Sequence, residues 1–129
     1  MTTQSRKLRT PLAAVRGLGS AKSGLGHWWH QRLTAIAMLP LVGWMVYLVI
    51  SLSGADYPTA MALISHPVNA PVLMLFIGVG MWHASLGIQV VAEDYISHEA
   101  TRLAVIIATK MAFILLASIS IFSILKIAL

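Results

Sequence analysis

The chain has 129 residues, of which 58% are hydrophobic and 10% are charged, with nine Lys or Arg against four Asp or Glu. Soluble domains carry about 25% charged residues, so this composition excludes an ordinary water-soluble globule, and its apolarity excludes intrinsic disorder. The sequence has no cysteine, which removes disulfide frameworks, thiolate metal sites and thiol catalysis. The composition predicts an integral membrane protein.

Basic residues crowd the N-terminal segment, and no acidic residue occurs before Asp56. We expect residues 1–29 to form a cytoplasmic arm that meets anionic lipid headgroups or a partner protein. An acid-free segment bearing Arg and Ser is also typical of an organellar transit peptide, which is the alternative interpretation. The basic residues of the first 26 positions are Arg6, Lys7, Arg9, Arg16 and Lys22.

Three apolar stretches follow, at about 30–52, 71–95 and 100–128. A helix rises about 1.5 Å per residue and the hydrocarbon core is roughly 30 Å thick, so each stretch is long enough to span a bilayer. Hydrocarbon offers the backbone no hydrogen-bond partners, which favours helices, and alternating ten-residue segments typical of membrane strands are absent. The sequence therefore predicts a single, all-α membrane-anchor domain with three transmembrane helices.

The basic residues also predict the orientation of the helices. Five precede the first span, whereas the loop at 53–70 has none. Cytoplasmic loops carry the excess of Lys and Arg, so we expect a cytoplasmic N-terminus and an external 53–70 loop. Within that loop, Pro58–Ile64 is predicted to form a short interfacial helix with proline in its first turn.

His83 is the ionisable residue nearest the middle of a span. It lies twelve residues after Pro71 and ten before Glu93, which is about 18 Å and 15 Å along a helix. Ionisable residues at this depth are costly, and a functional site is the default hypothesis. The alternative is a structural histidine that forms a hydrogen bond across two helices.

Small residues flank His83 along the helix. Gly80 and Gly87 lie within about 60° of it, one turn to either side. They would leave a flat space for a planar macrocycle, and histidine is a common axial ligand of haem iron. Close helix packing, with Gly80 and Ala84 as a small-xxx-small pair, is the alternative. A haem held by two histidines would need its second imidazole from another subunit or a second copy.

A second group of polar residues is predicted at the cytoplasmic boundary. Asp94 lies about 16 Å from His83 along the helix and about 20° off the same face, Tyr95 is adjacent, and Arg32 begins the first span. A quinone carbonyl needs hydrogen-bond donors at this depth, which tyrosine, oriented by the aspartate, and arginine can supply. The alternative interpretation is an aromatic belt with a snorkelling arginine.

Residues 83–95 read H-x3-G-x3-V-x2-D-Y, which resembles the signature of the hydrophobic membrane anchor subunits of succinate dehydrogenase. Residues 26–35, Gly-His-Trp-Trp-His-Gln-Arg-Leu-Thr-Ala, resemble the start of that family's first helix. The arm at 9–20 is similar to that of the bacterial members nearest to mitochondria. The resemblance extends over the whole chain in length, number of spans and placement of motifs.

The resemblance implies roles for individual residues. His83 would be one axial ligand of a b-type haem, with the second ligand from the other anchor subunit. Tyr95 would donate to the ubiquinone headgroup with the support of Asp94, and Arg32 would reach the haem propionates and the quinone pocket. An upstream histidine would join Arg32. His27 is the better match for it, and His30 is the alternative.

The implied function is the multi-pass anchor of succinate dehydrogenase in the bacterial inner membrane. Its implied partners are a second anchor of cytochrome b556 type, an iron–sulfur subunit, a flavoprotein subunit and membrane lipid, with no nucleic acid. The chain alone has no catalytic residue. The alternatives are the anchor of a quinol:fumarate reductase, a non-redox three-span scaffold, and a small ion-conducting subunit.

Overall fold

A computed structural model describes residues 10–16 and 24–129, and it is all-helical over those ranges. Three of its helices are long and apolar enough to cross a membrane, which confirms the predicted all-α membrane fold. The helices are α1 (Pro11–Val15), α2 (Gly24–Leu52), α3 (Tyr57–Ser65), α4 (Asn69–Tyr95) and α5 (Glu99–Ala128). Of the basic arm, Arg6, Lys7, Arg9 and Lys22 lie outside the described residues.

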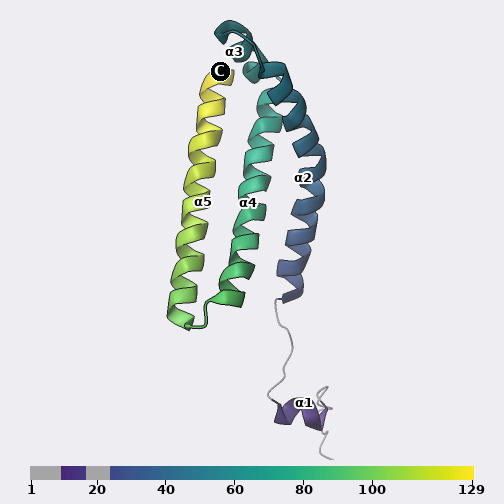
Figure 1. Cartoon of the computed structure of the whole chain (residues 1–129), viewed down its shortest axis with the longest axis vertical. Coiled ribbons are helices and arrows are strands. Elements are labelled where there is room, and N and C mark those ends of the chain that lie inside the picture. Colours follow the sequence, from purple (N-terminus) through teal and green to yellow (C-terminus); the bar gives the residue numbers. More distant parts are fainter. Residues whose placement is uncertain (1–9, 17–23) are drawn as a thin grey trace, which may run out of the picture.

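The three long helices lie side by side in a single row, with α4 in the middle (Figure 1). α4 packs against both α2 and α5, whereas α2 and α5 make no contact with each other within the described ranges. α4 also has the lowest mean hydropathy of the three long helices, as expected for a helix that packs against protein on two sides. The row is one helix thick, so it has two open faces and cannot surround a large ligand.

The first long helix begins earlier than the apolar pattern suggests. The sequence places the start of the span near residue 30, whereas α2 begins at Gly24. No proline interrupts 24–29, so the helix continues through His27, Trp28 and Trp29. These three side chains are therefore placed by helix geometry and not by a flexible arm.

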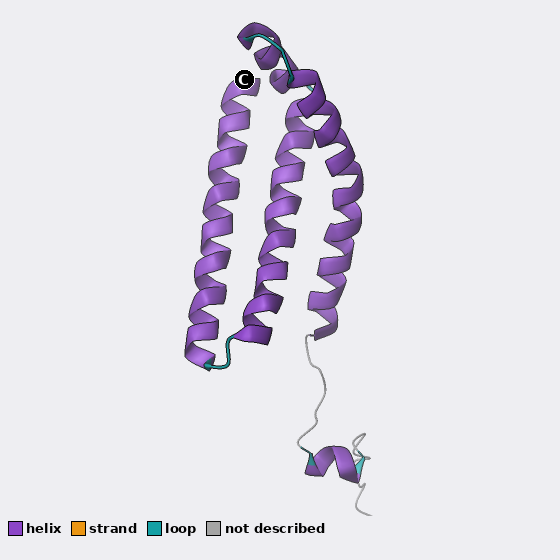
Figure 2. Ribbon diagram, in the orientation of Figure 1, coloured by secondary structure: helices purple, strands orange, loops and turns teal. Residues whose placement is uncertain are grey.

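Pro40 lies inside α2. Proline has no N–H and its ring crowds the carbonyl one turn earlier, so the helix bends at this point. The ribbon of α2 is bowed accordingly (Figure 2). Leu41 and Leu48, the most buried side chains of α2, come after the bend in the sequence. The α2 residues that line the cavity described below come before it.

The short helix α3 covers one end of the row, where it contacts α2, α4 and α5. Gly54, at φ 81°, makes the turn out of α2 in a backbone conformation that favours glycine. Asp56 then caps α3 by accepting a hydrogen bond from the Thr59 N–H at 3.1 Å. The hydrogen bonds from Thr59 lower the pKa of the Asp56 carboxyl. The helix predicted at Pro58–Ile64 is therefore confirmed in position.

Few of the side chains that the structure describes are buried. The apolar ones are Leu41, Leu48, Ala70, Ala92 and Ile124, and the polar one is Asn69. Most large apolar side chains of the three long helices are exposed. In an aqueous protein such faces would be unstable, whereas here they are available to lipid and to partner helices.

Asn69 ties α4 to α3. Its side-chain Nδ2 donates to the Leu63 carbonyl at 2.8 Å, and that carbonyl lies in the last turn of α3, where intrahelical partners run out. Asn69→Ala leaves this carbonyl unpaired and should lower the free energy of unfolding by about 1–3 kcal/mol. Equilibrium unfolding in mixed micelles measures the change. Ser51→Ala, which removes a hydroxyl bonded only within α2, is the control and should leave the value unchanged.

Candidate cavity between α2 and α4

A cavity of about 360 Å³ opens between the N-terminal half of α2 and the C-terminal half of α4. The five α2 residues that line it have helical spacing i, i+1, i+4, i+5 and i+8, so they form one face of that helix. Two residues of α4 form the opposite wall. The lining residues are His27, Trp28, Gln31, Arg32, Ala35, His83 and Val90.

His83 lies at the middle of α4, fourteen residues after Asn69 and twelve before Tyr95. It is half-buried, and its Nδ1 lies 2.8 Å from the Thr34 hydroxyl oxygen on α2. Its other ring nitrogen, Nε2, makes no hydrogen bond to any residue that the structure describes. The hydrogen bond between Thr34 and His83 is the one side-chain hydrogen bond between two long helices in the described part of the chain.

The Thr34 hydroxyl has a single proton, which decides the tautomer of His83. Thr34 Oγ1 lies 2.7 Å from the His30 carbonyl oxygen, and a carbonyl can only accept. The hydroxyl donates to that carbonyl, so its oxygen accepts from the Nδ1–H of His83. The tautomer with the proton on Nδ1 leaves a lone pair on Nε2, the form of imidazole that binds a metal.

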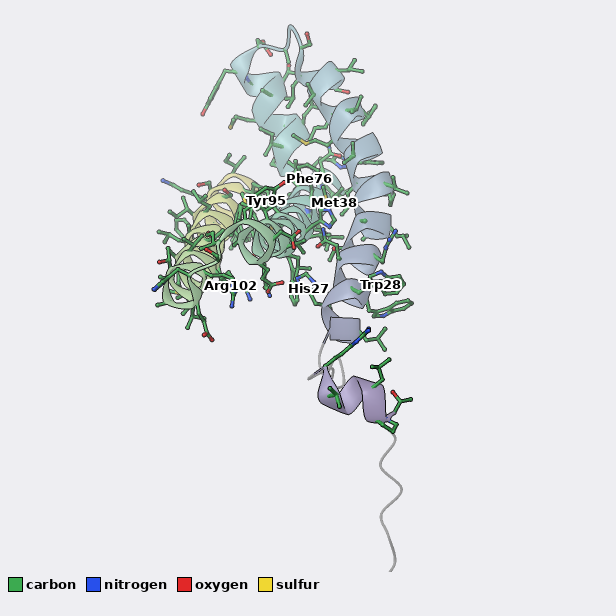
Figure 3. All side chains as sticks on the ribbon, turned by 60° about the horizontal axis from the view of Figure 1, so that its bottom comes forward. His27, Trp28, Met38, Phe76, Tyr95 and Arg102 are labelled. Carbon is green, nitrogen blue, oxygen red and sulfur yellow. The ribbon has the colours of Figure 1, made fainter. Side chains whose placement is uncertain are left out.

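His27 and His30 differ sharply in their surroundings. His27 is half-buried, lines the cavity, and has an Nε2 that is buried without a hydrogen-bond partner. Figure 3 shows His27 on the side of α2 that faces α4. His30 is exposed, its Nδ1 bonds to the Gly26 carbonyl oxygen at 2.8 Å, and its ring stacks on Trp82. The geometry thus places His27, and not His30, beside His83.

Arg32 lies in the same cavity. It is the ninth residue of α2, two positions before Thr34, so it lies at nearly the depth of His83 and not at the end of the span. Its guanidinium lies 5.3 Å from the centre of the Trp28 ring, a cation–π contact. No carboxylate of the described residues lies within ion-pair distance of it. The cavity therefore carries an uncompensated positive charge.

Asp94 and Tyr95 lie outside this cavity. Tyr95 follows His83 by twelve residues, which turns it about 120° around the helix and moves it about 18 Å along the axis. Its side chain is 84% exposed, and Asp94 is also exposed. The structure thus brings His27, Arg32 and His83 together but keeps the Asp94–Tyr95 pair apart from them.

The two glycines beside His83 lie next to side chains of α2. A Cβ built on Gly80 would lie 3.6 Å from the Met38 Cε atom, and one on Gly87 would lie 3.8 Å from the Gln31 Nε2 atom. Both distances are ordinary van der Waals contacts with α2 side chains, so a methyl group at either glycine would fit without moving α2. Space for a planar macrocycle on this face, and close helix packing as its alternative, therefore both stay predictions at these two positions.

Sequence reasoning missed Gln31 and Thr34. Gln31 lines the cavity, and its Oε1 is buried without a partner. Together with His27 these residues have spacing i, i+4 and i+7, a polar stripe along one face of α2. This stripe is the sequence signal from which Gln31 and Thr34 could have been found, and it marks the face of α2 that meets α4.

A second cavity, of about 420 Å³, lies between α4 and α5. Its walls are apolar apart from Ser85 and Lys110. Ser85 is about 160° around α4 from His83, so this cavity lies on the other side of the helix. None of the residues predicted for the haem or quinone site lines it.

Comparison with known proteins identifies the family. Residues 6–117 match the family described as the succinate dehydrogenase/fumarate reductase transmembrane subunit. The chain belongs to this family. The matched range includes every residue of the α2–α4 cavity and the Asp94–Tyr95 pair. No solved structure matches the chain significantly.

Several relatives within this transmembrane-subunit family are similar over most of their length. The succinate dehydrogenase hydrophobic membrane anchor subunit of Rickettsia bellii is 36% identical over 83% of this chain and 86% of its own. The membrane anchor subunit of Reclinomonas americana is 33% identical over 64% of this chain and 71% of its own. The Paracoccus denitrificans anchor subunit is 28% identical over 84% of each chain.

Proposed function

We propose that this chain is the hydrophobic membrane anchor subunit of a succinate dehydrogenase in the bacterial inner membrane. In this role it supplies one axial ligand of a haem b and part of a ubiquinone-reduction site. The family match, the names of the relatives and the three long apolar helices support the anchoring role. The hydrogen bond at Nδ1 of His83, which leaves Nε2 free, supports the haem ligand.

The observation that carries the haem proposal is the free Nε2 of a mid-span imidazole. The Nδ1–H of His83 is engaged by Thr34 at 2.8 Å, which leaves a lone pair on Nε2 for iron. A haem held there supplies one-electron transfer between Fe³⁺ and Fe²⁺. The row of helices is one layer thick, which supports the proposal that a second anchor subunit, of cytochrome b556 type, would provide the other ligand and wall.

The other polar residues of the cavity suit the propionate groups of a haem. The propionates of a haem are carboxylates, and Arg32 offers a guanidinium with no carboxylate partner among the described residues. His27 adds a buried Nε2 that lacks a hydrogen bond. Arg32 and His27 would therefore hold the propionates while His83 holds the iron.

The quinone site is proposed at the end of α4. Reduction of ubiquinone to ubiquinol takes up two electrons and two protons, so the headgroup needs proton donors near water. The Tyr95 phenol can donate to a quinone carbonyl, and Asp94 can orient that phenol. Arg32 lies apart from this pair, in the α2–α4 cavity, so its proposed role is at the haem propionates. Both Asp94 and Tyr95 are exposed, so the remaining walls of this site would belong to partner subunits.

The proposed partners complete the electron path. Oxidation of succinate to fumarate on a flavoprotein subunit releases two electrons and two protons, and an iron–sulfur subunit passes the electrons toward the membrane. The relatives are named as anchors of this enzyme, which supports the same assembly here. The chain itself would contribute the haem and quinone contacts described above, whereas succinate oxidation would take place on the partners.

A second candidate function is the anchor of a quinol:fumarate reductase, because the description of the family includes both enzymes. The two differ in direction. Turnover of the purified complex separates them: succinate with ubiquinone should be faster than fumarate with menaquinol if the proposal is correct.

If two anchor subunits share the haem, this chain should need its partner in order to bind haem. A tagged chain expressed alone should bind little or no haem, whereas the chain purified with its partners should show a b-type spectrum. The measurement is a reduced-minus-oxidised absorption spectrum with haem and protein quantified. A partnered complex with no b-type signal would favour the non-redox scaffold, and stoichiometric haem in the isolated chain would contradict the sharing.

A further inference from the structure

Thr34 forms a hydrogen bond with His83, the proposed haem ligand, and neither the family match nor any motif of the sequence assigns Thr34 a role. It lies on α2, and its hydroxyl is the only described side chain from another helix that forms a hydrogen bond with His83. The two residues are 49 positions apart in the sequence. The contact therefore depends on how α2 and α4 pack.

We infer that Thr34 is the positioning residue for His83: its hydroxyl fixes the proton on Nδ1, aims Nε2 at the iron and tunes the electron density of the ring. This inference rests on the proposed role of His83 as a haem ligand. Ligating histidines commonly donate their second N–H to a carboxylate, carbonyl or water. Here a threonine hydroxyl from the neighbouring helix takes that place.

The hydroxyl is well suited to hold a ring in one orientation. Threonine is branched at Cβ, so its χ1 torsion has few allowed values in a helix. Its oxygen lies 2.7 Å from the His30 carbonyl and 3.1 Å from the Gln31 carbonyl, both in the preceding turn of α2. The hydroxyl is thus anchored to the backbone, and the imidazole is anchored to the hydroxyl.

The chain of hydrogen bonds also has an electronic effect. Each bond polarises the next, so a hydroxyl that donates to a carbonyl becomes a stronger acceptor for the Nδ1–H. A stronger acceptor at Nδ1 makes Nε2 more basic, and a more basic ligand stabilises Fe³⁺ over Fe²⁺. Loss of the hydroxyl should therefore raise the reduction potential of the haem.

Thr34→Val is the test, because valine keeps the branched shape and loses the hydroxyl. In the assembled complex we expect haem affinity to fall about tenfold, in the range usual for loss of such a partner. We also expect the preference of the haem for the ferric over the ferrous state to fall about tenfold. This equals an upward shift of the haem reduction potential by about 59 mV for one electron. Potentiometric titration of the b-type absorbance and EPR of the low-spin ferric signal measure both effects.

Thr34→Ser separates the hydroxyl from packing, because serine keeps the oxygen and loses the methyl group. The inference predicts a wild-type potential and EPR signal for Thr34→Ser, and a shifted potential or lost haem for Thr34→Val. Equal shifts in both variants would assign the effect to packing and overturn the inference. An unchanged potential and unchanged haem content in Thr34→Val would overturn it too.

Failure of the inference is distinguishable from failure of the proposed function. If the wild-type complex has no b-type haem, or if His83→Ala leaves its spectrum unchanged, the proposed role of His83 is wrong. If the wild-type spectrum is present and depends on His83, but Thr34→Val behaves as wild type, only the role of Thr34 is wrong.

Discussion

His83→Ala should abolish the b-type absorption spectrum of the purified complex, or convert it to that of a haem with an altered ligand set. The substitution removes Nε2, the nitrogen that Thr34 leaves free for iron, and no other described imidazole lies at that position. The measurement is a reduced-minus-oxidised spectrum, with the amount of each subunit quantified in the same sample.

His30→Ala is the matched control for the ligand prediction. His30 is also on the α2 side of the site, but it is exposed and its Nδ1 bonds within its own helix. Its removal should leave the spectrum intact. A normal spectrum in a fully assembled His83→Ala complex would reject His83 as the ligand.

Tyr95→Phe should slow ubiquinone reduction by about 100-fold, the lower end of what a positioned proton donor contributes. Phenylalanine keeps the ring and removes the hydroxyl, so anchoring should persist. Succinate oxidation with an artificial acceptor that bypasses the membrane should continue at the wild-type rate. The two rates are measured on one preparation.

Tyr57→Phe is the control for the quinone prediction, since Tyr57 is a similarly exposed phenol at the start of α3, beyond the opposite end of α4. It should leave both rates unchanged. A parallel loss of both rates in Tyr95→Phe would indicate misassembly, and full retention of quinone reduction would remove Tyr95 from the site.

Some features of the cavity were predictable from local pattern alone. His83 lies at the midpoint of α4 because the limits of an apolar segment set its centre, whatever packs around it. The short helix at 57–65 was predictable because Pro58 stands in its first turn, a position that proline favours. Gly80 and Gly87 were ambiguous, because the same spacing serves a ligand slot and a close helix contact.

Other features depended on where α2 begins and how it is rotated. Its start at Gly24 carries Arg32 to nearly the depth of His83, away from Asp94 and Tyr95. The sequence grouped Arg32 with those two residues because the apolar run, taken alone, begins near residue 30. Hydropathy marks apolar length and not the first helical turn, so it could not place this boundary.

By itself the sequence determined three apolar spans, an all-helical membrane fold and an imidazole near mid-membrane, because length and hydropathy are properties of each segment alone. Only the tertiary structure decided that Thr34 forms a hydrogen bond with His83, that His27 and not His30 lines the cavity, and that Met38 and Gln31 are the α2 side chains beside the two glycines. These are contacts between helices far apart in sequence. The relative rotation and depth of α2 and α4 create them, and neither quantity is encoded in the periodicity of one helix.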